Sequence, residues 1–244
     1  MRIAVIGSQG QGKSTFIDDF LKVWPMYTKS EGKYRKAIKE QNLTINQEGT
    51  QENQQIIMDA IIDEMMLYPK NTNVIHDRCS IDNLVYSMWL YEKNKGNIDD
   101  KFIEKSLKLT HISLAFLDLV IFLPKLEKYQ IKLEEKETRD IDPVYADEIN
   151  NLYLAIQDSY NKSQNTVFPF ETIEGSPALI EIFGTPQERI QMVKLYLDDT
   201  GEPFGKKTSD SLIQLPSLEE QAYIDKIIEQ NLPDKKPNQI PLIK

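Results

Sequence analysis

The hydrophobic positions along the chain follow two alternating patterns. Short apolar or β-branched runs, which are typical of buried strands, occupy residues 2–6, 71–79, 118–124 and 167–175. Elsewhere, apolar residues recur at helical spacing and predict helices at 13–23, 51–68, 80–94, 99–116, 146–162 and 185–199. The polar stretch 25–50 fits a further short strand and a helix near 33–40. Strands that alternate with helices predict an α/β fold, with a parallel sheet covered by helices on both faces.

The bulk composition limits the class of protein. With 244 residues, of which 40% are hydrophobic, the chain suits one α/β domain with an appendage. The net charge of −9 argues against a large nucleic-acid surface, although a local basic groove is left open. One cysteine, Cys79, and two histidines exclude an intrachain disulfide and argue against a zinc cage. No apolar run approaches the roughly 18 residues of a membrane span, so we expect a soluble, cytoplasmic protein without a membrane partner.

The composition changes after residue 200. The stretch that follows is rich in turn-forming residues, a helix fits 217–231, and the last residues look extended. We therefore expect a principal domain at 1–197 and a C-terminal extension at 198–244. The extension is a lid, an arm that joins copies of the chain into a homo-oligomer, or a disordered tail, and the sequence leaves these three alternatives open.

The first strand and helix are joined by the segment GSQGQGKS, residues 7–14, which fits the phosphate-loop pattern G-x-x-x-x-G-K-[ST] without a mismatch. A loop that wraps a phosphate must point successive main-chain N–H groups inward, and glycine tolerates the conformations that this requires. The following helix adds its positive N-terminal end. The lysine can reach the β- and γ-phosphates, and the serine hydroxyl can complete the shell of a Mg²⁺ ion. The loop residues expected to bind ATP are Gly7, Gln9, Gly10, Gln11, Gly12, Lys13, Ser14 and Thr15.

An acid and an arginine, Asp77 and Arg78, lie at the end of the second buried run. In an open parallel sheet, ligands bind at the carboxyl edge of the strands. There Asp77 can orient a Mg²⁺-bound water or accept a proton from an acceptor hydroxyl. Arg78 can hold an acceptor phosphate or neutralise charge on the transferred group. The alternative is a surface ion pair at the strand end. We expect both residues to be catalytic, with Asp77 also a ligand of the Mg²⁺ ion beside Ser14.

These segments together resemble a known superfamily. The stretches GSQGQGKST, TQENQQII, HDRCSIDNLVYS, DLVIFLP and RDIDPVYADEI resemble the P-loop nucleoside and nucleotide kinases. They look most similar to the small AAA-type ATPase and kinase family that includes the nicotinamide riboside kinase domain of NadR-like proteins and many phage proteins. The resemblance covers about residues 1–197. It implies a three-layer fold with five parallel strands, Mg²⁺ and ATP as the donor, and phosphoryl transfer to a hydroxyl or a phosphate.

The resemblance also implies roles for two loops. The charged segment 126–145 would be a lid over the triphosphate, in which Arg139 contacts ATP and stabilises charge on the transferring phosphoryl. Asp140 and Asp142 would then orient Arg139 or cap the helix near residue 143 rather than bind metal. The stretch GSPALIEIFGTPQERI, residues 175–190, resembles the loop that holds the adenine base.

Four residues are candidates for contact with the acceptor. Glu31 and Arg35 follow the expected second strand, where related kinases place a carboxylate against the acceptor. Asp82 and Tyr86 fall on one face of the helix at 80–94 because they are four positions apart. They either line the acceptor pocket or occupy core or solvent positions.

Three functions fit this sequence. The first is a kinase that phosphorylates a nucleoside, a (deoxy)nucleoside monophosphate or a related riboside. The second has the same chemistry with a modified base or an end in DNA as acceptor, as in phage DNA modification, and the acidic composition weakens it. The third is an NTPase or ATP-binding assembly module without a small-molecule acceptor. The sequence shows no obvious hydrolytic signature, and an arginine supplied by the chain itself, Arg139, favours transfer.

Overall fold

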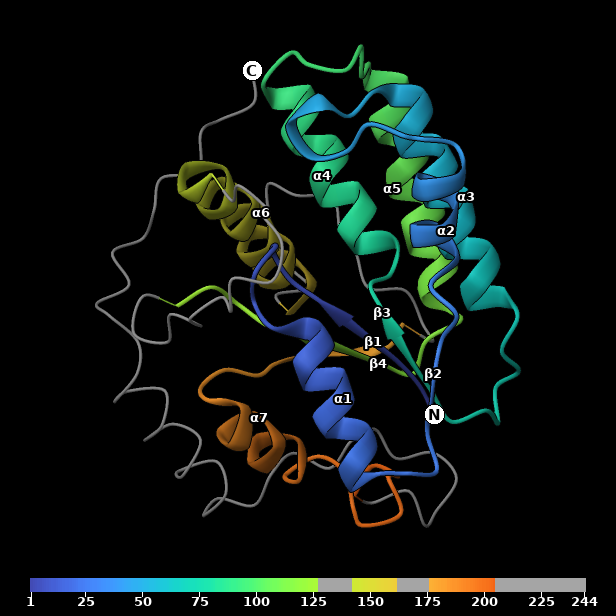
Figure 1. Cartoon of the computed structure of the whole chain (residues 1–244), viewed down its shortest axis with the longest axis vertical. Helices are drawn as coiled ribbons and strands as arrows, with labels where there is room; N and C mark the ends of the chain where they lie inside the picture. Colours follow the sequence, from blue (N-terminus) through green and yellow to red (C-terminus); the bar gives the residue numbers. More distant parts are fainter. Residues whose placement is uncertain (127–141, 162–175, 205–244) are drawn as a thin grey trace.

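The computed structural model describes residues 1–126, 142–161 and 176–204, and within these ranges five strands form one parallel sheet. The strands are β1 (Arg2–Ile6), β2 (Thr28–Lys29), β3 (Val74–Asp77), β4 (Leu119–Phe122) and β5 (Ala178–Glu181). Their order across the sheet is β2-β3-β1-β4-β5, and every neighbouring pair is parallel. The predicted α/β fold with a five-stranded parallel sheet is therefore confirmed (Figure 1).

Helices connect the strands as the hydrophobic spacing predicted. They are α1 (Lys13–Val23), α2 (Lys33–Glu40), α3 (Gln51–Met66), α4 (Ser80–Glu92), α5 (Asp100–Leu114), α6 (Pro143–Asn161) and α7 (Pro186–Val193), with a short 3-10 turn η1 (Asn46–Glu48) before α3. The largest difference from the expected bounds is at α7, which ends at Val193 and not near residue 199. After Val193 the chain continues in a tighter turn, in which the N–H of Tyr196 donates to the carbonyl three residues earlier, that of Val193, at 2.9 Å.

One expectation about the last strand needs correction. The segment 175–190 was expected to be the loop that holds the adenine base, but its residues Ala178–Glu181 form β5 and pair with β4. This edge strand has only four residues, and its apolar Leu179 is buried. The strand expected at 167–175 lies outside the described residues.

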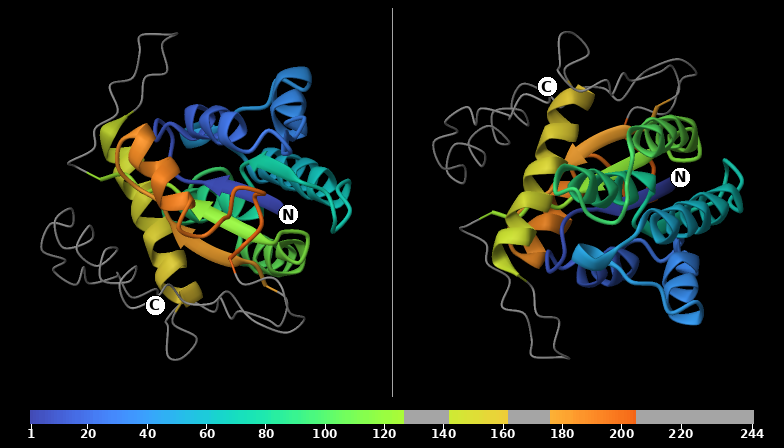
Figure 2. Two further views of the ribbon diagram at one scale, coloured as in Figure 1. Left: turned by 90° about the horizontal axis from the view of Figure 1, so that it is seen from below. Right: turned by 90° about the horizontal axis from the view of Figure 1, so that it is seen from above.

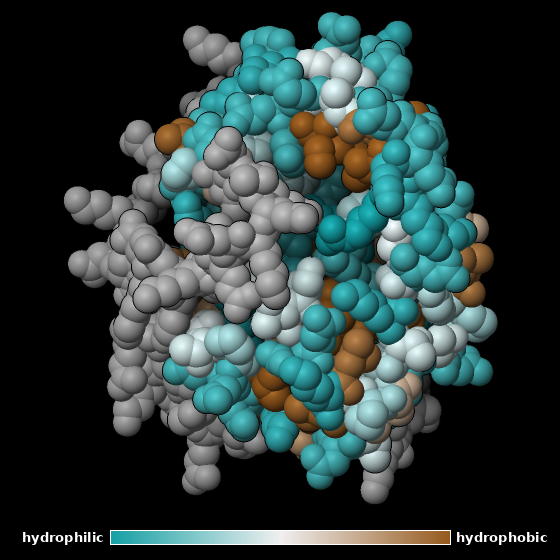
Figure 3. Space-filling model, in the orientation of Figure 1, coloured by the Kyte–Doolittle hydropathy of each residue, from teal (hydrophilic) through white to brown (hydrophobic). Residues whose placement is uncertain are grey.

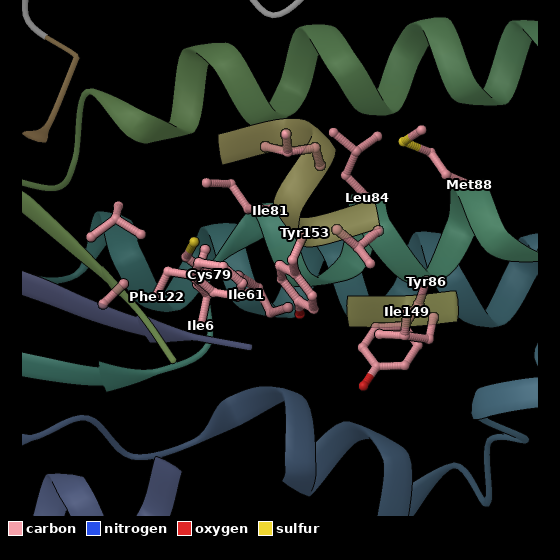
Figure 4. Packing of buried hydrophobic residues seen from close by; sticks show 14 of the residues in the cluster. Ile6, Ile61, Cys79, Ile81, Leu84, Tyr86, Met88, Phe122, Ile149 and Tyr153 are labelled. Atoms are coloured by element: carbon pink, nitrogen blue, oxygen red, sulfur yellow. The ribbon is translucent and has the colours of Figure 1, made fainter. Parts of the chain in front are cut away.

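The sheet is covered on both faces, so the fold has the three layers that the sequence predicted. Successive side chains of β1 point to opposite faces, as in any strand. Ile3 and Val5 pack in a hydrophobic cluster with α1 and α7, whereas Ala4 and Ile6 pack in a second cluster with α3, α4 and α6. Figure 4 shows part of this second cluster, in which Ile6, Phe122 and Tyr153 meet side chains of α4.

Helix α6 lies at the carboxyl edge of the sheet. Both views of Figure 2 show it beside the arrowheads of β4 and β5. Its side chain Asn150 accepts a hydrogen bond from the N–H of Lys125, just beyond β4, at 2.7 Å. Its first turn is capped by Asp142, whose Oδ1 accepts from the N–H of Val144 at 2.9 Å. The predicted capping role of Asp142 is confirmed, and Asp140 lies outside the described residues.

The last described residues are fixed at the other end of α1. Trp24 Nε1 donates to the carbonyl of Asp198 at 2.8 Å, and the Tyr27 hydroxyl donates to the carbonyl of Gly201 at 2.7 Å. Because α1 runs from the carboxyl edge of the sheet to its amino edge, these contacts place residues 198–204 far from the phosphate loop. In the described ranges, no helix combines the length and apolar character needed to cross a membrane.

Candidate active site

The phosphate loop joins β1 to α1 at the carboxyl edge of the sheet. Gly7 has φ of +144°, and a Cβ atom on it would lie 2.5 Å from the carbonyl oxygen of Leu123. Gly12 caps α1 in the left-handed conformation, with φ of +71°. A side chain is sterically excluded at Gly7 and strained at Gly12, so the glycines of the motif are required by the shape of the loop.

The main chain of the loop presents a row of free donors. From Gln9 to Thr15, none of the N–H groups donates a hydrogen bond to another described residue, and the first bond of α1 runs from Phe16 N–H to the carbonyl of Gly12. Free N–H groups that point into one concavity, together with the N-terminal end of a helix, bind anions. The loop therefore has the donors that a triphosphate needs.

The lysine of the motif is folded back into this loop. Lys13 is buried, and its Nζ donates to the carbonyls of Gly7 at 2.7 Å and Ser8 at 2.8 Å. Burial, and next the nearby charge of Arg78, lower the pKa of Lys13 to about 7, against the opposing effect of two carboxylates. A bound phosphate would supply the negative charge that restores the charged form of the ammonium group.

Two oxygen donors are suited to Mg²⁺. Ser14 is exposed in the first turn of α1, and Asp77 has one buried carboxylate oxygen, Oδ1, without a hydrogen-bond partner in the described structure. Among the described residues no group of three or more His, Cys, Asp or Glu side chains is placed to hold a metal. Mg²⁺ fits such a sparse set of hard oxygen ligands, because it commonly takes one or two protein ligands and completes its shell with phosphates and water.

Asp77 ends β3 beside β1 and is held by Arg35 of α2. Its Oδ2 accepts a hydrogen bond from Arg35 Nη2 at 2.5 Å. Burial alone would raise the pKa of Asp77, but the charge and hydrogen bond of Arg35, with help from Arg78 and Lys13, lower it overall. Asp77 is thus ionised at neutral pH, as a proton acceptor or metal ligand must be.

Arg78 follows in an unusual backbone conformation. Its φ is +88°, a region that residues with side chains rarely adopt. Its Nη1 donates to Oδ1 of Asp82 at 3.2 Å, and its guanidinium lies 5.2 Å from the centre of the Tyr86 ring. Non-glycine residues held in this way cluster at functional sites, so the geometry supports a role for the strand end beyond a surface ion pair.

Asp82 is the most enclosed carboxylate of the site. It accepts from Arg78, from the Tyr153 hydroxyl at 2.5 Å, and from the N–H of Cys79 at 3.0 Å. Cys79 is the N-cap residue of α4, so the last of these bonds is part of a capping box. Burial raises the pKa of Asp82 in spite of the opposing charge of Arg78. Figure 4 shows Tyr153 and Tyr86 entering from α6 and α4, with the Tyr86 hydroxyl pointing out of the apolar cluster.

A cavity of about 520 Å³ opens beside these groups. It is lined by Gln9, Tyr34, Arg35, Ile38, Ile45, Asn46, Gln54, Ile57, Ile61, Arg78, Asp82, Asn83 and Tyr86. In Figure 3 an apolar patch interrupts the hydrophilic surface in the region of α2 and α4. The size of the cavity, and its mixture of apolar walls with a few polar groups, are typical of a small-molecule site.

The structure brings several of the predicted site residues to one cavity. Gln9 of the phosphate loop and Arg35, Arg78, Asp82 and Tyr86 all line this cavity. Glu31 is not among them. That the cavity binds an acceptor stays a prediction.

Glu31 instead lies at the surface. Its carboxylate is 3.2 Å from Nζ of Lys36, and both side chains are mostly exposed. The buried carboxylate near this point is that of Glu64 on α3, which accepts from the N–H of Gly32 at 2.6 Å and so caps α2. The predicted lid arginine, Arg139, lies outside the described residues.

Sequence reasoning missed a polar pair in the cavity. Asn83 Nδ2 donates to the side-chain oxygen of Gln54 at 2.8 Å and to its carbonyl at 3.0 Å. Both residues are buried, and Oδ1 of Asn83 has no hydrogen-bond partner in the described structure. The sequence presents TQENQ only as part of a motif. The contact between Gln54 and Asn83 depends on how α3 packs against α4, which no local pattern predicts.

Comparisons with known proteins agree with this architecture. No protein-family model matches the chain, and no curated protein matches it. The structure of deoxyadenosine kinase from M. mycoides with the products dCMP and a flexible dCDP matches with a TM-score of 0.56 and 20% identity, over 79% of this chain and 96% of that chain. The same enzyme with bound dATP matches with a TM-score of 0.52 and 18% identity, over the same shares of the two chains.

A structure of the NadR protein in complex with NR matches with a TM-score of 0.48 and 14% identity, over 94% of this chain and 51% of that chain. That TM-score is too low to establish a shared fold by itself. The matches to deoxyadenosine kinase show that this chain has the fold of the P-loop nucleoside kinases, as its sequence motifs predicted.

The buried lysine leads to a testable prediction. At pH 8 the free protein holds Lys13 mostly neutral, and bound phosphates favour its charged form, so ATP binding should take up about one proton. Calorimetric titrations of Mg-ATP in two buffers of different ionisation enthalpy measure this uptake. The Lys13→Met variant should bind more weakly and take up no proton through this site. Equal binding heats in both buffers for the unaltered chain would contradict the prediction.

Proposed function

We propose that the chain is a kinase that transfers the γ-phosphoryl group of Mg-ATP to a hydroxyl of a nucleoside or a related riboside. One observation carries the proposal: the ionised Asp77 and its neighbour Arg78 stand between a phosphate loop with free N–H donors and a cavity of small-molecule size. A triphosphate site, a proton acceptor and an acceptor pocket are the parts that phosphoryl transfer requires.

The charges of the cavity favour an uncharged acceptor. Of the described residues that line it, the cations are Arg35 and Arg78, and each is paired with a carboxylate. A monophosphate would need at least one unpaired cation to offset its charge. A nucleoside needs none, and its heterocycle can lie between the isoleucines of α2 and α3.

The polar pair in the cavity suits the edge of such a heterocycle. Gln54 and Asn83 carry amide donors and acceptors side by side, and the free Oδ1 of Asn83 can accept a hydrogen bond. A nucleobase, or a ring that carries a carboxamide group, presents a hydrogen-bond donor next to an acceptor. Since nearly every base does so, this pair supports recognition of a planar heterocycle without selecting one.

The chain's own groups divide the chemical work. The loop amides and Lys13 hold the β- and γ-phosphates, and Arg78 offsets charge on the transferred group. Asp77 accepts the proton of the acceptor hydroxyl as the new P–O bond forms, while the bond between the γ-phosphorus and the bridging oxygen breaks and ADP leaves. Ser14 and Asp77 would hold Mg²⁺, which supplies charge neutralisation on the phosphate oxygens. Arg139 is proposed to add a second arginine to the transferred group from the lid.

The structural neighbours support this reading and leave the acceptor open. The deoxyadenosine kinase from M. mycoides was solved with dCMP and dCDP as products and with dATP. We extend nucleotide binding, but not a particular base, from that protein to this chain. No feature of the described residues favours a DNA acceptor, because the cavity lies between helices and carries paired charges.

The acceptor class can be tested directly. The purified chain with labelled Mg-ATP should phosphorylate at least one member of a panel of ribo- and deoxyribonucleosides and nicotinamide riboside. Nucleoside monophosphates should be poor acceptors, because the arginines of the cavity are already paired. Product only from monophosphates or from DNA, or phosphate release that no acceptor stimulates, would overturn the proposal.

The role of Asp77 can be separated from its part in an ion pair. Asp77→Asn should lower kcat by roughly 10²–10⁴-fold, since it removes the proton acceptor, while ATP still binds. Asp118→Asn is the matched control, because Asp118 also pairs with an arginine, Arg2, at 3.0 Å but lies at the amino edge of the sheet. It should reduce thermal stability without a comparable loss of kcat. Steady-state kinetics and melting curves of both variants decide the point, and full turnover in Asp77→Asn would remove the assigned role.

A further inference from the structure

A buried arginine on α7 touches the phosphate loop from behind. Arg189 is 3% exposed. Its Nη1 donates to the carbonyl of Gln11 at 2.7 Å, and its Nε donates to the carbonyl of Gly184 at 3.0 Å. The two carbonyls belong to segments that are more than 170 residues apart in sequence, so Arg189 joins the phosphate loop to the turn before α7.

Like Lys13, Arg189 is buried without a carboxylate partner, and this sets it apart from the other described arginines. Within the described ranges it has no carboxylate at ion-pair distance, whereas Arg2, Arg35 and Arg78 each have one. Burial lowers the pKa of Arg189, and no nearby acid opposes this effect. A buried charge without a counter-charge is costly, and such a cost is tolerated where a ligand supplies the missing charge.

The bond to Gln11 fixes the direction of one peptide group of the loop. In a trans peptide the C=O and the following N–H point in opposite directions. Because the Gln11 carbonyl points at Arg189, the N–H of Gly12 points away from α7, and it donates to no described residue. If this peptide turned over, a carbonyl oxygen would take the place of a donor among the free amides.

The other anchor of Arg189 belongs to the capped start of α7. Thr185 and Glu188 form a reciprocal cap at the start of α7, with the N–H of Thr185 donating to Glu188 Oε2 at 2.7 Å. Gly184 has φ of +98°, and a Cβ atom on it would lie 2.6 Å from the Glu188 carboxylate. The arginine therefore ties the phosphate loop to a turn that the cap of α7 and the left-handed conformation of Gly184 define.

We propose that Arg189 is the positioning residue of the donor-phosphate site: it holds the Gln11–Gly12 peptide with its N–H toward the phosphates and adds a buried positive charge behind them. The inference rests on the proposed function in one respect, that the loop binds a triphosphate. The phosphate-loop motif lies wholly between β1 and α1. The inference adds a residue of α7 to the groups that support phosphate binding.

The test measures phosphate binding apart from base binding and apart from transfer. The full chain and its Arg189→Met and Arg189→Lys variants are titrated calorimetrically with Mg-ATP and, separately, with Mg-tripolyphosphate, which has no base. Arg189→Met should weaken binding of both ligands by about tenfold or more, because a charge and an oriented donor are lost together. Arg189→Lys keeps the charge but cannot bridge two carbonyls, so its loss should be intermediate.

A melting curve of each variant without ligand separates positioning from structural support. Arg189→Met removes an uncompensated buried charge together with two hydrogen bonds, so its melting temperature should change little. The matched control is Arg2→Met, since Arg2 is also buried and donates to a carbonyl, that of Ala115, but is paired with an acid at the opposite edge of the sheet. It should lower the melting temperature and leave Mg-ATP binding intact.

The outcomes distinguish this inference from the proposed function. Arg189→Met that binds Mg-tripolyphosphate as tightly as the unaltered chain overturns the inference, and so does a loss seen only with Mg-ATP, which would assign Arg189 to the base. Should Arg189→Met fail to fold, Arg189→Lys carries the same comparison. An unaltered chain that binds both ligands but phosphorylates no acceptor contradicts the kinase proposal alone, and one that binds neither overturns both.

Discussion

The position of β1 at the centre of the sheet determines where the polar groups of the site can lie. All five of its residues are buried, with one hydrophobic cluster on each face. Between Arg2, which pairs with Asp118, and the phosphate loop, the enclosed strand has no room for polar groups, so they gather where the strands end. Val5 pairs in register with Asp77 of β3, which places the phosphate loop and the Asp77–Arg78 strand end side by side.

Charge is distributed unequally across this edge. On the acceptor side, Arg35 and Arg78 are each matched by a carboxylate, and the cavity is close to neutral. On the donor side, Lys13 and Arg189 bind only carbonyl oxygens and are buried. Polyanions are attracted to buried positive charge that lacks a partner, and neutral molecules are not. This imbalance is the basis for the proposal that a triphosphate binds at the loop, where it would favour the charged form of Lys13, and that an uncharged acceptor binds in the cavity.

Local patterns in the sequence were sufficient for β1, β3 and β4, the helices, the phosphate loop and the Asp77–Arg78 strand end, because each depends on the spacing of a few neighbouring residues. They were insufficient for contacts made by tertiary packing. Gln54 and Asn83 meet from two helices, and Arg189 reaches back to Gln11 across most of the chain. The three apolar positions of β5, Ala178 to Ile180, were too short a signal among turn-forming residues, which is why the base loop was misplaced.

Arg78 lies between the phosphate loop and the cavity and is bonded to residues on both sides. A residue with a side chain at φ of +88° carries strain of about 1–3 kcal/mol, which persists only where its surroundings hold it. Its N–H donates to the carbonyl of Val5 at 3.1 Å, and its guanidinium is held by Asp82. One anchor lies at the entry to the phosphate loop and the other on α4, in the wall of the acceptor cavity. Arg78 is therefore held in this strained conformation from both sides, by β1 at the entry to the phosphate loop and by Asp82 in the wall of the cavity.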